Sequence, residues 1–195
     1  MAEAEWVRIV NEARVLSERV LEDRTRLIGR TPHVGREAWL HIVFRGLKEE
    51  EIQTLEAQLA LRLPDEVRTF LAQQNGLSVF SDAMSLDGLR TSYVRAGDAA
   101  YQPYSIVPPN IDERPAFAPD SAFFLGGYSS DGSLLYIDQA LAGRVFRCAR
   151  DSGEILNEWT TLSEMLDNEV RRLAALFDMH GRRLDPDRPR KRGKA

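Results

Sequence analysis

The chain has 195 residues, 43% of them hydrophobic and 29% charged, so it can bury a substantial core and is most simply one globular domain with extensions. It has no apolar run near the roughly 20 residues of a membrane-spanning helix, and its acidic N-terminus is unlike a basic secretory signal. We therefore expect a cytoplasmic protein that does not insert into membranes. The single cysteine, Cys148, excludes an internal disulfide and lies in an apolar segment, which favours a buried, inert thiol.

The net charge of −4 is unevenly distributed along the chain. Residues 181–195 carry seven basic and two acidic side chains, a net +5, which leaves −9 on residues 1–180. An acidic body attracts basic partners and repels nucleic acid. The segment 181–195 is charged, rich in proline and without apolar periodicity, so we predict a disordered basic tail. A solvated tail is the favoured interpretation, and this tail is the one segment suited to contact nucleic acid.

Apolar residues recur at helical spacing through the N-terminal part of the chain. The spacing predicts one amphipathic helix over about residues 3–28, ended by Gly29. The apolar run 38–44 fits either a short strand or a helical turn, and the pattern leaves both open. A second helix is expected over about residues 48–61, where three glutamates in the first turn complement the helix dipole.

The next stretch, LPDEVRTFLAQQNG (residues 63–76), predicts a short helix with clear start and stop signals. Pro64 suits the first helical position, because its ring fixes φ and the N–H that it lacks would have had no helical partner. Asn75 and Gly76 tolerate left-handed geometry and predict a helix C-cap. Since the apolar residues between them fall on one face, we interpret the segment as a structural helix rather than a direct binding site.

Beyond Gly76 the pattern changes to short strands, expected at residues 79–80 and 84–86. Residues 91–120 contain five prolines and three tyrosines and show no sustained period, which predicts a long surface loop. Loops of this length are uncommon unless they are functional or mobile. This loop is therefore our candidate for an element that contacts a partner.

The C-terminal half predicts an antiparallel meander followed by a helix. Strand signals at residues 122–128, 133–138 and 144–148 are joined by the turn sequences SSDG and LAGR. Thr161-Leu-Ser-Glu164 fits a capping box, and the helix that it starts should end near His180-Gly181. The order of N-terminal helices, a mostly antiparallel sheet and a C-terminal helix indicates an α+β fold in one compact domain.

The sequence carries no enzyme signature that we could identify. It lacks GxGxxG, GxxxxGK[ST], HExxH and GxSxG. The three histidines, His33, His41 and His180, do not have the spacing of metal ligands and are more simply structural or solvated. We therefore expect a non-enzymatic protein with no catalytic residues, no metal, no cofactor and no small-molecule substrate.

Residues 47–76 resemble the signature of the SUKH superfamily, the domain family of fungal cell-wall assembly regulators and bacterial toxin-immunity proteins. That signature places an Ile and a Leu-Glu on one helix, then Leu-Pro, an acidic turn, Phe-Leu and a terminal Asn-Gly on the next. The matching residues are Ile52, Leu55, Glu56, Leu63, Pro64, Phe70, Leu71, Asn75 and Gly76. The strands FLGGYSSDGSLLYID and GRVFRC and the closing helix are also similar to the family, so the resemblance covers residues 47–177. The chain departs from the pattern at Val67, where an aromatic is common, and in the second hairpin, where it has Gly132-Ser133-Leu134 and members often carry an extra Gly-Asp.

The resemblance implies a SUKH-like domain over residues 47–180, preceded by an N-terminal helix and connecting segment (1–46) and followed by the basic tail (181–195). It also implies a non-enzymatic protein that binds another protein. In bacteria this would be an immunity protein that neutralises a toxin, often a nuclease, whose basic surface would suit the acidic body. The loop residues expected to make this contact are Tyr93, Asp98, Tyr101, Tyr104, Asp112 and Glu113.

Two other functions remain open. The chain could be a regulator or scaffold of the cell-wall assembly type that binds several cellular proteins. It could also be an enzyme whose site is assembled from scattered carboxylates, which would require a concave pocket with shifted carboxyl pKa values.

Overall fold

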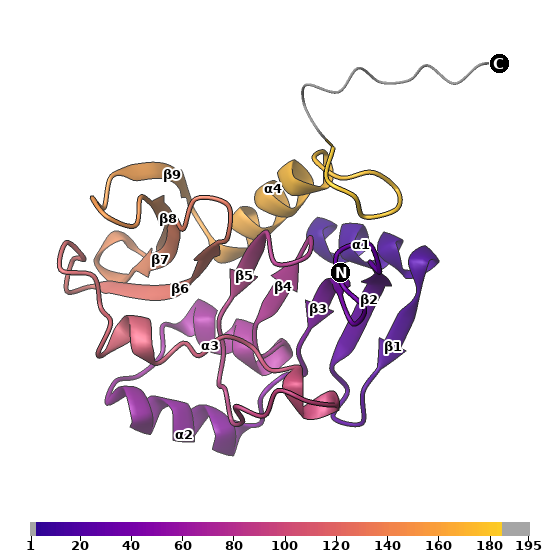
Figure 1. The fold of residues 1–195 in the computed structure, drawn as a ribbon. Coiled ribbons are helices and arrows are strands. Elements are labelled where there is room, and N and C mark those ends of the chain that lie inside the picture. Colours follow the sequence, from indigo (N-terminus) through magenta and orange to yellow (C-terminus); the bar gives the residue numbers. More distant parts are fainter. Residues whose placement is uncertain (1–2, 185–195) are drawn as a thin grey trace.

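A nine-stranded antiparallel sheet runs through the computed structural model, which describes residues 3–184 (Figure 1). The strands lie in the sheet in chain order: β1 (Glu18–Val20), β2 (Arg26–Arg30), β3 (Trp39–Val43), β4 (Leu77–Val79), β5 (Met84–Leu86), β6 (Ala122–Tyr128), β7 (Leu134–Asp138), β8 (Arg144–Cys148) and β9 (Ile155–Trp159). The α-helices of this region are α1 (Glu5–Glu12), α2 (Glu49–Leu59), α3 (Asp65–Gln73) and α4 (Leu162–Ala174). The α+β class predicted from the sequence is confirmed.

The predicted helix over residues 3–28 is wrong. Only α1 is α-helical, a 3₁₀ turn follows it over Ala13–Leu16, and β1 and β2 then form a hairpin. Leu27 and Ile28 are both fully buried but pack into different clusters, Ile28 with the helices and Leu27 with Trp39. Consecutive residues on opposite faces are typical of a strand, and pairing with β3 outweighs the local helical spacing. The same pairing decides the run 38–44, which is a strand.

The helices α2 and α3 lie where the sequence predicted them, and they pack against one another below the sheet (Figure 1). Asn75 does not cap α3. Its side chain instead accepts a hydrogen bond from the backbone N–H of Leu89 and donates one to the carbonyl of Leu89, at 2.6 and 2.8 Å. Gly76 has φ +92°, so the left-handed geometry expected at the end of the segment occurs at this glycine alone.

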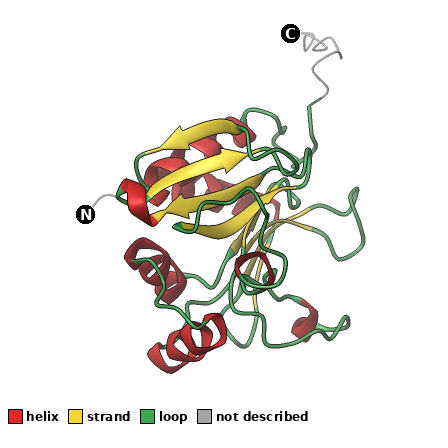
Figure 2. Ribbon diagram, turned by 90° about the vertical axis from the view of Figure 1, so that its left-hand side faces the viewer, coloured by secondary structure: helices red, strands yellow, loops and turns green. Residues whose placement is uncertain are grey.

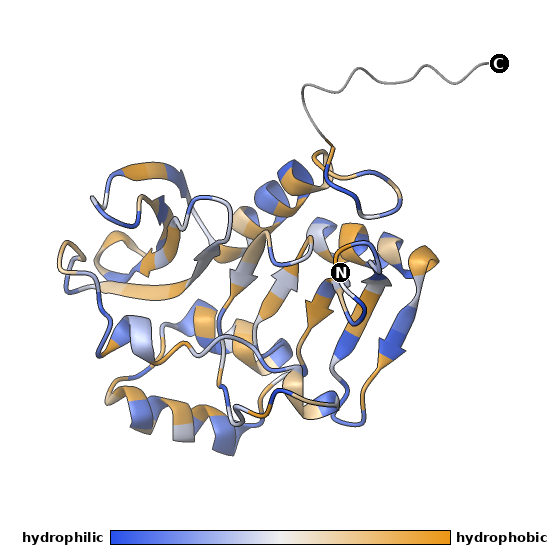
Figure 3. Ribbon diagram, in the orientation of Figure 1, coloured by the Kyte–Doolittle hydropathy of each residue, from blue (hydrophilic) through white to orange (hydrophobic). Residues whose placement is uncertain are grey.

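Strands β6, β7 and β8 confirm the predicted meander, and β9 is an additional strand that the sequence pattern did not predict. The apolar run of β6 is continuous because both faces are buried. Phe123 and Leu125 pack into the main core with the helices, whereas Ala122 and Phe124 pack into a second cluster with Tyr136. Figure 3 shows the first part of β6 as a hydrophobic stretch that becomes pale toward the end of the strand.

The helices α1 and α4 lie together on the sheet (Figure 2). The helix α3 is joined to the start of α4 by a hydrogen bond from the N–H of Leu162 to Glu66 at 2.8 Å. The backbone N–H of Trp6 donates to Asp167 at 2.8 Å, which docks α1 on α4. Thr161 caps α4 as predicted, since its hydroxyl accepts the N–H of Glu164 at 3.1 Å. The helix ends at Ala174, before the predicted end near residues 180–181, and the chain then turns back. Most of the predicted tail, residues 185–195, lies outside the described residues.

Candidate functional site

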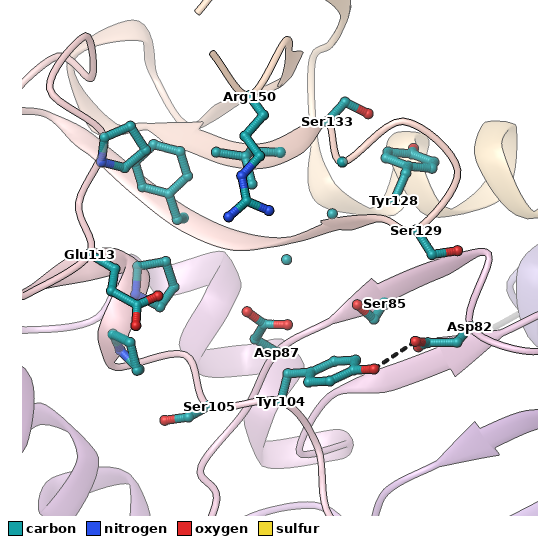
Figure 4. Close-up of a pocket in the computed structure, with 18 of the residues that line it drawn as sticks. Asp82, Ser85, Asp87, Tyr104, Ser105, Glu113, Tyr128, Ser129, Ser133 and Arg150 are labelled. Atoms are coloured by element: carbon teal, nitrogen blue, oxygen red, sulfur yellow. Dashed lines mark hydrogen bonds between the residues drawn. The ribbon is translucent and has the colours of Figure 1, made fainter.

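A groove opens where β5 and β6 separate from each other (Figure 4). The two strands pair only through Met84–Leu86 and Gly126–Tyr128, and the space beyond this pairing has a volume of about 840 Å³. The loop between β5 and β6 forms one wall, and the β6–β7 and β8–β9 turns form the other. The groove therefore brings together segments that lie far apart in the sequence.

Glycines at the end of β6 allow the close approach of β5 that starts the groove. Gly126 has φ +149°, and a Cβ placed there would lie 2.1 Å from the carbonyl oxygen of Ser85. A β-bulge between Phe124 and Gly126 bends the strand at the same point. Any larger residue at Gly126 would push the two strands apart and change the floor of the groove.

Hydrogen bonds, two sets of them from buried asparagine side chains, fix the long loop at three points. Asn75 holds Leu89, a short parallel bridge joins Gly88 to Ser105, and the side chain of Asn110 pairs with Phe124. The loop is irregular and mainly at the surface, as predicted, but Ile106 and Asn110 are buried. These anchors place the groove-facing part of the loop in a defined position.

The wall formed by β5 and the loop carries a small network of acidic and hydroxyl groups. The hydroxyl of Tyr104 donates to Asp82 at 2.7 Å, and this bond with the acceptor carboxylate raises the pKa of Tyr104 to about 12. Ser78 contacts the same carboxylate at 3.2 Å. Asp87 is half-buried and points into the groove (Figure 4). Burial, together with the nearby charge of Asp82, raises the pKa of Asp87 to about 8.

Acidic groups outnumber basic groups around the groove. Within the described part of the chain, four carboxyl groups line it, from Asp82, Asp87, Glu113 and Asp151, against two guanidinium groups, from Arg90 and Arg150. None of the four carboxyl groups forms a salt bridge to any residue between 3 and 184. A cleft that holds titratable groups with shifted pKa values is a candidate functional site, because folding does not require such groups there.

The two arginines of the groove have different surroundings. The guanidinium of Arg90 donates to the carbonyls of Ser92 and Pro103, at 3.0 and 3.3 Å, and lies 4.7 Å from the centre of the Tyr93 ring. Arg150 is exposed on the opposite wall and extends toward the space above Asp87 (Figure 4). Arg90 therefore supports the loop, whereas Arg150 contributes its charge to the groove itself.

The structure brings together three of the six predicted site residues, because Tyr93, Tyr104 and Glu113 all line the groove. The other three lie elsewhere. Asp98 pairs with Arg19 of β1 at 2.7 Å. Tyr101 packs against the Leu27–Trp39 cluster and donates to the carbonyl of Glu37, and Asp112 is exposed away from the groove. Asp82, Asp87 and Arg150 also line the groove and were not predicted as site residues. The sequence signal of Asp82 and Asp87 was turn chemistry, since they flank a short strand.

The histidines and the cysteine lie away from the groove. His41 is buried, its Nδ1 accepts the N–H of Phe80 at 3.4 Å, and burial lowers its pKa to about 3. Cys148 is buried as predicted. Among residues 3–184, no cluster of three His, Cys, Asp or Glu residues is arranged to hold a metal ion. In the same part of the chain, no helix has both the length and the hydrophobicity of a bilayer span.

The SMI1/KNR4 family (SUKH-1) matches residues 46–168, which is more than half of the chain. The chain belongs to this family. No curated protein matches it. Proteins of the SUKH-1 family bind protein partners and are generally non-enzymatic domains, and membership fits a toxin-immunity or a regulatory role. The match includes β4 to β9, α2, α3 and the loop, so the whole groove of this SUKH-1 protein lies within the matched region.

Proposed function

We propose that this SUKH-1 protein is a cytoplasmic immunity protein that neutralises a cognate bacterial toxin by binding it directly, without catalysis. The acidic groove is the observation that carries this proposal. Its carboxyl groups have no salt-bridge partner among residues 3–184, and its tyrosines supply the aromatic surface that is enriched at binding hot spots.

The expected partner is a basic toxin domain, for example a nuclease, since a nuclease needs positive charge to hold phosphate. Charge complementarity raises the association rate of such a pair, while tight protection also needs desolvated anchors. Tyr93 and Tyr104 are suited to this role, because their side chains are 72% and 53% exposed at the edge of the groove. Glu113 adds negative charge on the same side.

We place the partner contact on the SUKH-like domain over residues 47–180, with residues 1–46 and the basic tail 181–195 outside it. The hairpin β1–β2 extends the same sheet at the edge far from β9. Asp98 and Tyr101 join the loop to this N-terminal part. Their proposed role is therefore to position the loop, and Asp112 is left as a peripheral contact.

Co-expression with each neighbouring gene product tests the immunity role. We expect one neighbour to be toxic alone, and we expect this protein to restore growth and to co-purify with it. The double variant Tyr93→Ala with Tyr104→Ala should weaken the complex at least tenfold. The control is Val15→Ala, which changes another exposed apolar residue at a position far from the groove residues in the sequence. Harmless neighbours with no complex would instead favour the second function, a regulator or scaffold that binds several cellular proteins.

A further inference from the structure

Asp87 lines the groove between Glu113 and Asp82 (Figure 4). It follows β5, and its backbone N–H donates to the carbonyl of Leu125 at 2.7 Å, so the main chain is fixed by the separating strands. No side chain between residues 3 and 184 donates a hydrogen bond to the Asp87 carboxyl group. A cation that reaches a fixed and unpaired carboxyl group inside a groove stabilises its ionised form.

The charged and titratable groups around Asp87 favour a cation over an anion. They are Asp82 from the β4–β5 turn, Tyr104 and Glu113 from the loop, Arg90 after β5, and Arg150 and Asp151 from the β8–β9 turn. Arg90 is held by two carbonyls and lies against the Tyr93 ring, and among residues 3–184 it forms no ion pair with Asp87. Arg150 faces the site from across the groove (Figure 4).

The aromatic lining of the groove suits the flat face of a guanidinium group. Tyr104 lines it and is 53% exposed. Tyr128 and Phe124 also line it but are buried, and Tyr128 already has the guanidinium of Arg147 at 4.0 Å from its ring centre. Planar cations stack on such rings and pair with carboxylates through two parallel hydrogen bonds. The volume of about 840 Å³ accommodates an arginine side chain together with the backbone that carries it.

We propose that the groove binds an arginine side chain of the partner protein, with its guanidinium paired to Asp87 and packed beside Tyr104. This rests on the proposed function only in taking the partner to be a protein. Arg150 on the opposite wall opposes the incoming charge and keeps the guanidinium on the Asp87 side.

The binding should be coupled to the loss of a proton from Asp87. The pKa of about 8 means that the carboxyl group is mostly protonated at pH 6 and mostly ionised at pH 9. A guanidinium binds the ionised form, so the affinity should increase with pH over this range, by up to about tenfold per pH unit below the pKa. Arginine itself stays charged throughout, so the protein alone sets this dependence.

The test is a titration of the full-length protein with the peptide acetyl-Gly-Arg-Gly-amide, followed by amide NMR shifts. The matched control peptide carries citrulline, which keeps the shape of arginine but is neutral. We expect shifts at residues lining the groove, at least tenfold weaker binding of the citrulline peptide, and tighter binding at pH 9 than at pH 6. Asp87→Asn should weaken binding of the arginine peptide at least tenfold and remove its pH dependence.

Two further variants complete the test. Arg150→Gln should tighten binding about threefold, because it removes the opposing charge. Asp120→Asn, an exposed carboxylate that does not line the groove, should change nothing. Equal binding of both peptides, shifts outside the groove, or unchanged binding by Asp87→Asn would overturn the proposal. No toxin is used in this titration, so rescue of a toxic neighbour together with a negative titration would refute the arginine site but leave the immunity role standing.

Discussion

The side-chain amide of Asn110 pairs with both backbone groups of Phe124, accepting its N–H at 2.8 Å and donating to its carbonyl at 2.9 Å. The amide thus replaces the neighbouring strand that β6 lacks at this point. Asn75 makes the same pair of bonds to Leu89 at the start of the loop. Two buried amides therefore set where the long loop leaves the sheet and where it returns to it.

Replacing Asn110 by alanine should lower the free energy of unfolding by about 3 kcal/mol, because it leaves the buried N–H and C=O of Phe124 without partners. Urea denaturation measures this loss. The nearby exposed variant Asp112→Ala should stay within about 0.5 kcal/mol of the parent. A comparable loss in both variants would contradict a specific role of the Asn110 amide.

Glu169 links α4 to the groove. Glu169 is 4% exposed, and its carboxylate accepts the hydroxyl of Tyr128 at 2.7 Å and pairs with Arg172. Burial raises the pKa of Tyr128 and the Glu169 charge raises it further, so the tyrosine stays protonated. Glu169→Ala should cost about 3 kcal/mol in chemical denaturation, since it leaves polar groups unpaired. The exposed Ser163→Ala on the same helix is the control, and an equally small effect of both would argue against the link.

His41 should make the protein less stable in acid. Its pKa of about 3 in the folded state lies below the ordinary value of 6.5, so the unfolded chain takes up the proton first as the pH falls. The stabilisation is complete above pH 6.5 and is lost down to about pH 3, at up to about 1.4 kcal/mol per pH unit. His41→Leu should flatten this part of the stability curve, while the exposed His33→Gln should keep it. An unchanged slope in His41→Leu would show that other groups cause the acid sensitivity.

Asp87 should have the opposite effect at alkaline pH. Its folded pKa of about 8 lies above the ordinary value of 3.8, so the unfolded chain loses this proton first as the pH rises. The contribution of Asp87 to the free energy of unfolding is therefore complete below pH 3.8 and is lost as the pH rises toward 8. Asp87→Asn removes this penalty and should therefore raise the melting temperature at pH 9 but not at pH 4. A residue needed for folding would give the reverse, a lower melting temperature at every pH.

The helix α3 should prove structural, as its sequence predicts. The carboxylate of Glu66 accepts the backbone N–H of Leu162 at 2.8 Å and so joins α3 to the start of α4, whereas Asp65 is exposed. Glu66→Ala should cost about 1 kcal/mol, the size of a lost helix cap, and Asp65→Ala should cost little. Calorimetry measures both, and neither variant should weaken the complex with the partner. Loss of binding at an unchanged melting temperature would place α3 in the interface instead.

Local sequence signals predicted most of the elements from residue 47 onward. The start signals of α2, α3 and α4, and the strand and turn pattern of β6 to β8, depend on neighbouring residues and appear in the structure as expected. The predicted ends of α3 and α4 do not, since Asn75 does not cap α3 and α4 ends at Ala174. The N-terminal prediction failed because residues 18–28 satisfy a helical period, yet their pairing with β3 buries both faces of β2. Strand pairing is a long-range interaction and leaves no reliable local signal.

The candidate site shows the same division. The sequence alone indicated an acidic body, a loop over residues 91–120 suited to a partner, and the SUKH resemblance, because composition, punctuation and spacing are local properties of the chain. Only the tertiary structure brought Tyr93, Tyr104 and Glu113 together with Asp87 and Arg150. The reason is physical: the separation of β5 from β6 opens the groove, and burial next to Asp82 shifts the pKa of Asp87. Both depend on residues that are distant in the sequence and close only in the folded chain.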